Sequence, residues 1–488
     1  MLPRMTTALT TEPAVLIQPT AALDRSLTWA GVAVLLLGLS MAVGDFFIVN
    51  VALPSIARTL DASSAALELI VAGYGTAYAV FLVPGGRLGD TRGRRGVFLV
   101  GIASFTLASA LCGLAPNAAM LVGARIAQGV AAALLVPQVL AAIQAGLSGR
   151  DRQRALARYG GTLGAAAVTG QLLGGLIVQA DLARLAWRPV FLVNVPIGLL
   201  TMALTLGLVP DTRGAIRARL DIRGGVLLAV ALLSLLVPAT MGRELGWPVW
   251  ALALPPVVPL ALMALIRHGR RMEAAGVEPL LPPTLLALSG LRVGLGVAVA
   301  LFLALGGFFL TTALSLQDGL RFGPLEAGLT MLPYASALLL VSLTGRWLAR
   351  SIGSRIVVLG AVSFTAGMGL LALEAGLFYR FETYWTLAPA MALIGAGQGL
   401  ILAPLFGIAL AGVPADRAGA ASGLLSTTIQ ASLAVGAAGL GLVFFSLLGS
   451  VAGPVAFGRA TAAAAGASAL LGLAVAWLAR RLPDTGIA

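Results

Sequence analysis

The sequence contains no lysine, one cysteine and one histidine. Because Cys112 is the only cysteine, an internal disulfide and a cysteine-based zinc site are excluded, and we expect a small buried side chain. The single His268 lies beside Arg267 and Arg270, which indicates a solvated loop residue. All 32 basic residues are arginine, and the net charge is +13. No arginine run is interleaved with aromatic residues, so we expect no nucleic-acid partner.

Charge is also scarce, since charged residues make up 10% of the chain while hydrophobic residues make up 59% and the mean hydropathy is +0.98. This balance is typical of polytopic membrane proteins rather than of soluble domains. The sequence has no Walker-type phosphate loop, metal-ligand cluster or nucleophile arrangement. We therefore expect neither an ATP-driven pump nor an enzyme, and no cofactor beyond a proton gradient as the energy source.

Fourteen apolar runs are long enough to cross a bilayer as helices, which takes about 20 residues. They occupy 28–50, 66–86, 96–114, 119–146, 156–179, 187–209, 222–241, 247–266, 292–315, 326–345, 355–377, 384–411, 418–448 and 460–479. With the N-terminus inside, 24 of the 32 arginines fall in the tails and the inner loops, and seven fall in the outer loops. Positive charge accumulates on cytoplasmic loops, so we expect a multi-pass protein of the cytoplasmic membrane with both termini cytoplasmic.

A charged segment, Gly86–Arg95, separates the second and third runs, and we interpret it as a cytoplasmic turn outside the lipid. A weaker copy, Gly345–Arg355, follows the tenth run, with Arg350 at the place of Asp90. The copy indicates two six-span units around a central cavity, the layout of alternating access. The predicted division is a tail at 1–27, a bundle at 28–210, an insertion of two spans with linkers at 211–289, a bundle at 290–480 and a tail at 481–488.

Four further stretches, which occur in order along the chain, carry motifs that belong with the charged segment. They are Asp45–Pro54, Arg125–Gly129, Gly170–Gly175 and Trp187–Gly198. Together with Gly86–Arg95 they resemble the motifs of the major facilitator superfamily, and more narrowly those of its fourteen-span drug:proton antiporter family. Phe47 and Gln171 depart from the family pattern, in which threonine and proline are usual.

The resemblance implies an all-α polytopic membrane protein with the major facilitator fold, two six-helix bundles plus two extra central transmembrane helices. It implies a proton-coupled antiporter that exports amphipathic drugs, cationic ones among them. The expected partners are protons, a small-molecule substrate and the lipid bilayer, and we expect a monomer. The alternatives are an exporter of one specific metabolite or antibiotic and a membrane sensor or scaffold that transports nothing.

Asp45 and Arg125 are the candidates for proton coupling. Asp45 lies late in the first run, near its outer side, and a carboxylate facing lipid would cost about 2.5–3.5 kcal/mol. We therefore expect it to face protein or water, either as a proton carrier or as a structural carboxylate. Arg125 is the one arginine inside a predicted span, with Gln128 one turn away on the same face. It would pair with a carboxylate in one conformation and release it in another, or act as a fixed polar link between helices.

The charged segment and the fifth run supply the candidates for gating and for coupling. The gating candidates are Gly86, Asp90, Arg94 and Arg95, and the antiporter motif is Gly170, Gln171, Gly174 and Gly175. Asp90 would accept hydrogen bonds at a helix N-terminus or pair with an arginine and so stabilise one state, whereas the alternative is a charged anchor. The glycines suit close helix packing, and Gln171 removes the kink that a proline would produce.

The remaining candidates line the substrate cavity and are polar or aromatic residues of the predicted spans. They are Glu68, Tyr74, Tyr78, Gln128, Gln398 and Gln430. Tyr74 and Tyr78 share one face of the second span and would form an aromatic wall, with plain helix packing as the alternative. For the glutamines the alternative is hydrogen bonding between helices. Glu374 lies near the outer end of its span, where we expect a side chain that snorkels to the interface or contacts a loop, and no role in coupling.

Overall fold

The structure is a computed structural model that describes residues 27–181, 184–212, 221–242, 245–277, 279–413, 418–449 and 453–482. All regular elements in these ranges are helical. Long apolar segments become helices because a helix satisfies its own backbone hydrogen bonds, as a bilayer requires. Thirteen of the described helical segments are long and apolar enough to cross a membrane. The prediction of an all-α membrane protein is confirmed in these ranges.

The first group of helices surrounds the residues predicted for proton coupling. It consists of α1 (Trp29–Leu60), α2 (Ser64–Arg92), α3 (Arg94–Gly113), α4 (Ala118–Gly146), α5 (Gly149–Ala180), α6 (Pro189–Leu192) and α7 (Asn194–Leu208). Helix α1 packs against α5, and both α2 and α3 pack against α4. Buried Phe98, Phe105 and Leu135 fill the space between these helices. The group therefore has its own apolar core.

The second group repeats this packing. It consists of α11 (Ser289–Leu314), the π-helical turn η3 (Ser315–Gly319), α12 (Pro324–Ile352), α13 (Arg355–Leu377), the 3₁₀ turn η4 (Tyr379–Phe381), α14 (Ala388–Ala411), α15 (Ala418–Leu448) and α16 (Pro454–Ala479). Helix α11 packs against α15, and both α12 and α13 pack against α14, as α1, α2 and α3 do in the first group. The groups meet where α2 contacts α15 and where α5 contacts α12. These two contacts are equivalent, because α12 corresponds to α2 and α15 corresponds to α5. Such repeats are the basis of alternating access.

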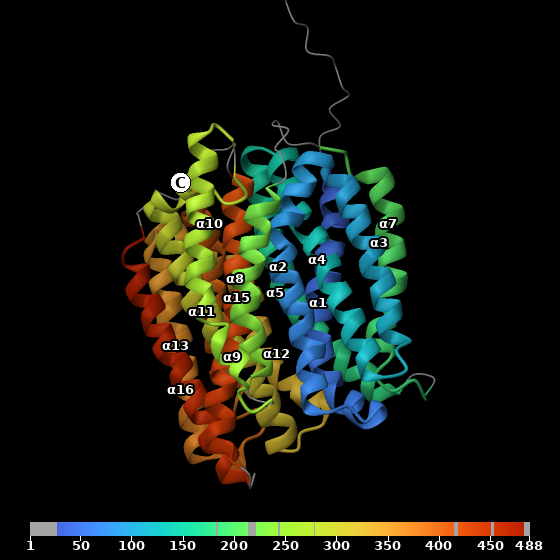
Figure 1. Ribbon diagram of the computed structural model, residues 1–488. Coiled ribbons are helices and arrows are strands. Elements are labelled where there is room, and N and C mark those ends of the chain that lie inside the picture. The colour runs from blue at the N-terminus through green and yellow to red at the C-terminus, as the bar shows by residue number, and fades with distance from the viewer. Residues whose placement is uncertain are drawn as a thin grey trace, which may run out of the picture.

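Two helices inserted between the groups lie alongside their seam, in front of α2 and α15 in Figure 1. They are α8 (Ile222–Met241) and the interrupted pair α9 (Val249–Ala253) and α10 (Val257–Ala274), followed by the 3₁₀ turn η2 (Pro283–Ala287). The predicted span 247–266 is not one continuous helix, because Pro255 and Pro256 stand between α9 and α10 and lack backbone donors. It is absent from the thirteen spans, so the fourteenth span stays a prediction.

The charged segment Gly86–Arg95 is not the ten-residue turn that the sequence predicted. Helix α2 continues to Arg92, and α3 begins at Arg94. The chain turns at Gly93, whose φ of 102° is a conformation that favours glycine. The expectation was wrong because helix α2 extends beyond its apolar stretch, and charged side chains at its exposed end do not interrupt a helix.

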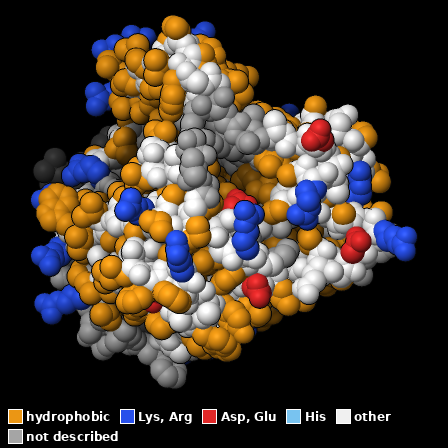
Figure 2. All heavy atoms as spheres, turned by 90° about the horizontal axis from the view of Figure 1, so that it is seen from below, with side chains coloured by type: hydrophobic (Ala, Val, Ile, Leu, Met, Phe, Trp, Pro, Cys, Tyr) orange, Lys and Arg blue, Asp and Glu red, His pale blue; other side chains and the backbone are white. Residues whose placement is uncertain are grey.

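Helix α1 begins and α16 ends at the same end of the bundle, the upper end in Figure 1. The opposite end carries scattered arginine side chains and a few acidic ones among apolar and small groups (Figure 2). Which of these ends faces the cytoplasm stays a prediction from the arginine count.

Candidate functional site

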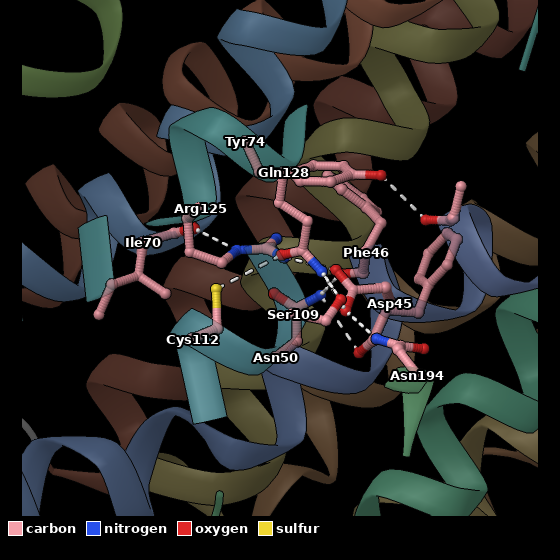
Figure 3. A network of polar contacts seen from close by, with 12 residues as sticks. Asp45, Phe46, Asn50, Ile70, Tyr74, Ser109, Cys112, Arg125, Gln128 and Asn194 are labelled. Atoms are coloured by element: carbon pink, nitrogen blue, oxygen red, sulfur yellow. Dashed lines mark hydrogen bonds and ion pairs between the residues drawn. The ribbon is translucent and has the colours of Figure 1, made fainter. Parts of the chain in front are cut away.

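Asp45 lies at the middle of α1, not near its outer side as expected, since the helix extends to Leu60. Its side chain is 2% exposed and accepts hydrogen bonds from two other helices (Figure 3). Oδ2 accepts from Nη1 of Arg125 at 2.5 Å, and Oδ1 accepts from Gln128 at 2.9 Å and from Asn194 at 2.7 Å. The structure therefore places a paired carboxylate in the interior of the first group.

Arg125 is completely buried on α4 and makes contacts on several sides. Besides Asp45, its Nη1 donates to Oε1 of Gln128 at 2.7 Å, and its Nε donates to the carbonyl of Ile70 at 3.0 Å. The guanidinium lies 4.3 Å from the centre of the Tyr74 ring, a cation–π distance. Its Nη2 has no hydrogen-bond partner among the described residues. Asp45 is thus the only negative charge paired with this cation in the described ranges, and neutral oxygens and aromatic rings make its other contacts.

Gln128 connects this pair to α3. Its Nε2 donates to Oγ of Ser109 at 2.8 Å, and the thiol of Cys112 donates to its Oε1 at 3.6 Å. Cys112 is buried, as expected, but it also has a polar contact. We call Asp45, Arg125, Gln128 and Asn194 the carboxylate network. It joins α1, α4 and α7 to one another and, through Gln128, to α3.

Sequence reasoning identified three members of the carboxylate network and missed Asn194. Asn194 opens α7 within the stretch Trp187–Gly198, where it is the only amide side chain among apolar residues. That isolation was the available signal. Burying a charge pair contributes little net stability, but removing one partner leaves an uncompensated charge and costs about 3–5 kcal/mol. Removal of either charge alone should therefore destabilise this arrangement.

Helix α5 approaches α1 next to this network. A Cβ atom on Gly170 would meet the carbonyl of Gly44, and a Cβ atom on Gly174 would lie 3.0 Å from the side chain of Ile48. Gly170 and Gly174 of the predicted antiporter motif therefore serve close helix packing. The third glycine of the motif, Gly175, is buried on the same helix. Helix α5 contains no proline.

A band of aromatic rings runs from α2 and α1 in the first group to α11 and α12 in the second. Successive ring centres are 6.2, 6.0, 5.2, 5.1 and 5.8 Å apart along Tyr78, Tyr74, Phe46, Phe47, Phe309 and Tyr334. We call these six residues the aromatic band. Tyr74 is additionally fixed by a hydrogen bond from its hydroxyl to the carbonyl of Ala42 at 3.0 Å. The band bridges the two groups beside the carboxylate network.

A recess of about 180 Å³ adjoins the band, lined by Gln171, Phe309, Met331 and Tyr334 among others. The hydroxyl of Tyr334 donates to Oε1 of buried Gln398 on α14. Gln171 and Gln398 thus bring amide groups to the aromatic surface. Gln430 is half-buried on α15. The side chain of Glu68 lies outside the part of the chain that the structure describes.

Asp90 pairs with Arg94 across the turn at Gly93, with Nη2 of Arg94 donating to Oδ1 at 3.0 Å. Gly86 and Asp90 line a recess of about 550 Å³, open to solvent, together with residues of α4, α5 and α15. Arg94 keeps Nε and Nη1 buried without hydrogen-bond partners in the described ranges. Arg95 is half-buried on α3. Gly86 and Asp90, with Arg94 paired to Asp90, therefore lie where the two groups approach each other, whereas no such contact is seen for Arg95 in the described ranges.

The single histidine is not a loop residue, which corrects the sequence interpretation. His268 lies on α10, and its Nε2 lies 2.8 Å from Oδ1 of Asp221, the residue that caps α8. Burial acts to raise the pKa of Asp221, but hydrogen bonds from the backbone of Gly224, from His268 and from the backbone of Leu280 outweigh it and lower that pKa. The interaction fastens the two inserted helices at the end of the molecule that holds the turn at Gly93.

The described residues contain no group of three or more histidine, cysteine and acidic side chains that could hold a metal ion. The chemistry available to the carboxylate network is the gain and loss of a proton and the making and breaking of a charge pair. The chemistry available to the aromatic band is stacking on flat, apolar molecules.

Comparison with known proteins agrees with the fold. The family description of the Major Facilitator Superfamily matches residues 35–437. A bacterial homologue of the human drug peptide transporters PepT1 and PepT2 superposes with a TM-score of 0.65 at 16% identity, over 92% of this chain and 98% of that one. That likeness concerns the fold alone.

Three relatives are more similar in sequence. A probable actinorhodin transporter of Streptomyces coelicolor is 38% identical over 87% of this chain and 74% of its own length. The cephamycin export protein of Amycolatopsis lactamdurans is 37% identical over 82% of this chain and 81% of its own length. The multidrug resistance protein Stp of Mycobacterium tuberculosis is 33% identical over 86% and 76%. With a family match over most of its length and such relatives, this chain belongs to the Major Facilitator Superfamily.

Proposed function

We propose that this chain is a proton-coupled exporter of antibiotics and other amphipathic compounds, with Asp45 as the proton carrier. Membership of the superfamily makes the chain a membrane transporter, and its relatives are named as exporters or resistance proteins. The observation that carries the coupling is the buried Asp45–Arg125 pair, because a carboxylate in that position can exchange its proton for a charge partner. The described helices hold no metal cluster that would serve instead.

Protonation would act by breaking the charge pair. A neutral Asp45 no longer balances Arg125, whose Nη2 is already without a partner in the described ranges. The cation would then be stabilised by a different set of contacts, and the conformation that supplies them would gain population. Asn194 ties the carboxylate to α7, so its release would loosen α1, α4 and α7 together. Substrate binding and protonation of Asp45 would thus shift the same conformational equilibrium in opposite directions.

The segment Gly86–Arg95 would hold the closed arrangement at its end of the molecule. Asp90 and Arg94 form a charge-assisted hydrogen bond beside the recess shared with α15 of the second group. Two further buried nitrogens of Arg94 can take another acceptor when the groups rock. We propose that this pair sets the rate of exchange between states.

The aromatic band and its amides would bind the substrate. Rings from both groups lie in one continuous row, so a flat molecule inserted among them contacts both halves of the transporter. The charge of Asp45 is balanced by Arg125, which favours neutral aromatic substrates over cations. A second candidate is an exporter of a single compound, which the names of the actinorhodin and cephamycin relatives favour.

The test is proton-driven transport in proteoliposomes. A growth screen in an efflux-deficient host first selects a substrate from aromatic polyketides, cephamycins and cationic dyes. Asp45→Asn should then abolish transport driven by a pH gradient, because asparagine cannot carry a proton. Substrate exchange at equal pH should continue, because asparagine resembles the protonated aspartate in shape and charge. Asp61→Asn, at the exposed end of the same helix, is the matched control. Full proton-driven transport by Asp45→Asn would disprove the assignment.

A further inference from the structure

A second buried polar cluster lies at the end of the second group opposite to the described termini. It is organised by hydroxyl groups where the π-helical turn η3, the turn η4 and α16 meet. The hydroxyl of Tyr379 lies 2.9 Å from Oγ of Ser315 and donates to the carbonyl of Ser315 at 2.8 Å. Thr461 donates to the same Oγ at 2.8 Å. These contacts fix η4 onto α16 and onto the end of α11.

Two carboxyl groups lie near this cluster, Glu382 buried and Glu374 half-buried. Glu374 lies in the last turn of α13, and Glu382 follows η4 with 8% of its surface exposed. Oε2 of Glu374 and Oε1 of Glu382 are buried and have no hydrogen-bond partner among the described residues. An ionised oxygen in such a position loses its hydration without compensation, which costs several kcal/mol unless the group takes up a proton.

Among the described residues, no positive charge forms an ion pair with Glu382. Arg380 on η4 and Arg459 on α16 are exposed. Asp318 on η3 adds a further negative charge close enough to act on Tyr379, and Arg321 partly balances it. Burial, followed by the like charge of Glu374, raises the pKa of Glu382 from an ordinary value of 4.5 to about 8.

We propose that Glu374 and Glu382 form a proton-binding site on the face opposite to the described termini, separate from the carboxylate network. The pair binds one proton, since one oxygen of each carboxyl group has no hydrogen-bond partner among the described residues. A divalent cation fits less well, because two carboxylates are too few ligands and the nearby hydroxyl of Tyr379 is already engaged. The site is independent of the proposed coupling at Asp45, so either assignment can fail without the other.

The proton holds η4 in place. While Glu382 is neutral it stays buried beside Glu374, and once both groups are ionised they repel each other. Because the pKa of Glu382 is raised on folding, its contribution to stability is complete below about pH 4.5 and is lost as the pH rises through about 8. Between these values each pH unit changes the folding equilibrium by up to about tenfold.

The experiment measures thermal unfolding of the full chain in detergent from pH 4.5 to 9. Glu382→Gln mimics the neutral side chain, so its unfolding temperature should fall less than that of the wild type as the pH rises, and at pH 9 the variant should be more stable. Glu374→Gln removes the like charge and should move the titration to lower pH. Glu326→Gln, at an exposed glutamate of α12, should follow the wild type.

Two further readouts identify the bound species. The infrared C=O stretch of a protonated carboxyl should disappear on raising the pH of the wild type, and this change should be absent in Glu382→Gln but retained in Asp45→Asn. The proposal is overturned if Glu382→Gln shows the pH dependence of the wild type, or if Asp45→Asn removes the titration. It is also overturned if Ca²⁺ or Mg²⁺ at pH 9 stabilises the wild type and not Glu382→Gln, because the site would then hold a cation.

Discussion

The two helix groups share one backbone arrangement at their centres. In the first group the carbonyl of Tyr74 on α2 packs against Gly129 of α4, and in the second the carbonyl of Tyr334 on α12 packs against Gly395 of α14. Each tyrosine ring also stands beside a phenylalanine of α1 or α11. The glycines permit the close approach in both groups, and the repeat therefore extends to individual contacts.

The groups differ in charge at matching positions. Arg125 lies four residues before Gly129, and Met391 lies four residues before Gly395; both side chains are completely buried. Asp45 directly precedes the two adjacent phenylalanines of α1, whereas Gly307 precedes those of α11. The second group thus has an apolar thioether and a glycine where the first has an ion pair. In the proposed function, proton coupling would accordingly be a property of the first group, while substrate binding would involve both.

The largest effect should follow from replacing Arg125 of the first group with methionine, the residue at the equivalent position of the second group. Arg125→Met leaves Asp45 buried without its cation, so we expect a loss of about 3–5 kcal/mol in the free energy of unfolding, measured by denaturation in detergent. Proton-driven transport should be lost as well. Adding Asp45→Asn should restore much of the stability and none of the transport.

The matched control for this experiment is Met391→Leu at the equivalent place on α14. A volume-conserving change between apolar residues costs less than about 1.5 kcal/mol. If Arg125→Met were no more harmful than Met391→Leu, or if the double variant gained nothing, the contrast between a charged and an uncharged group would be wrong.

The next effect concerns the Asp90–Arg94 pair, which we propose sets the rate of exchange between states. Asp90→Ala removes the charge-assisted hydrogen bond to Arg94, and we expect transport to slow by about tenfold, since such bonds contribute about 1.5 kcal/mol or more. Arg350→Ala, in the weaker copy of the segment, should slow transport less, although the side chain of Arg350 lies outside the described residues. Initial rates of uptake into inverted vesicles would measure both. Equal losses would remove the predicted asymmetry between the two segments.

The aromatic band should show no such asymmetry. Phe47 and Phe309 face each other across the two groups at 5.1 Å, so each contributes one ring to the same contact. Phe47→Ala and Phe309→Ala should each raise the KM for a flat aromatic substrate by about fivefold, which corresponds to about 1 kcal/mol of stacking. Substrate-concentration series for the two variants would test this. A change in one variant alone would assign substrate binding to a single group.

The sequence was sufficient for the helical membrane fold, because the length of an apolar run is a local property that a bilayer enforces. It also identified Asp45, Arg125 and Gln128, since ionisable or amide groups inside apolar runs are conspicuous. It did not reveal that Asn194 completes the network, because that contact joins helices 149 residues apart in sequence.

Helix boundaries and isolated charges were predicted less well. The extension of α2 through its charged end does not follow from an apolar pattern, because charged side chains at an exposed helix end do not interrupt a helix. His268 was taken for a loop residue because it stands among arginines, yet it lies on α10 and pairs with Asp221. The burial of Glu382 near Glu374 was missed for a different reason, since it depends on how the turn η4 packs against α13 and α16.

The smallest effect concerns Asp221 and His268. It tests whether this partly exposed interaction contributes as much to stability as the buried Asp45–Arg125 pair. The Asp221–His268 interaction fastens the inserted helices, but the His268 side chain is 22% exposed, so Asp221→Asn should cost about 1 kcal/mol. Because the pKa of Asp221 is lowered on folding, its contribution is present above its ordinary value of 3.8 and disappears as the pH falls through the lowered value. Unfolding of wild type and variant should therefore differ slightly at pH 6 and converge at acid pH. A loss as large as that of Arg125→Met would show that burial does not distinguish the two pairs.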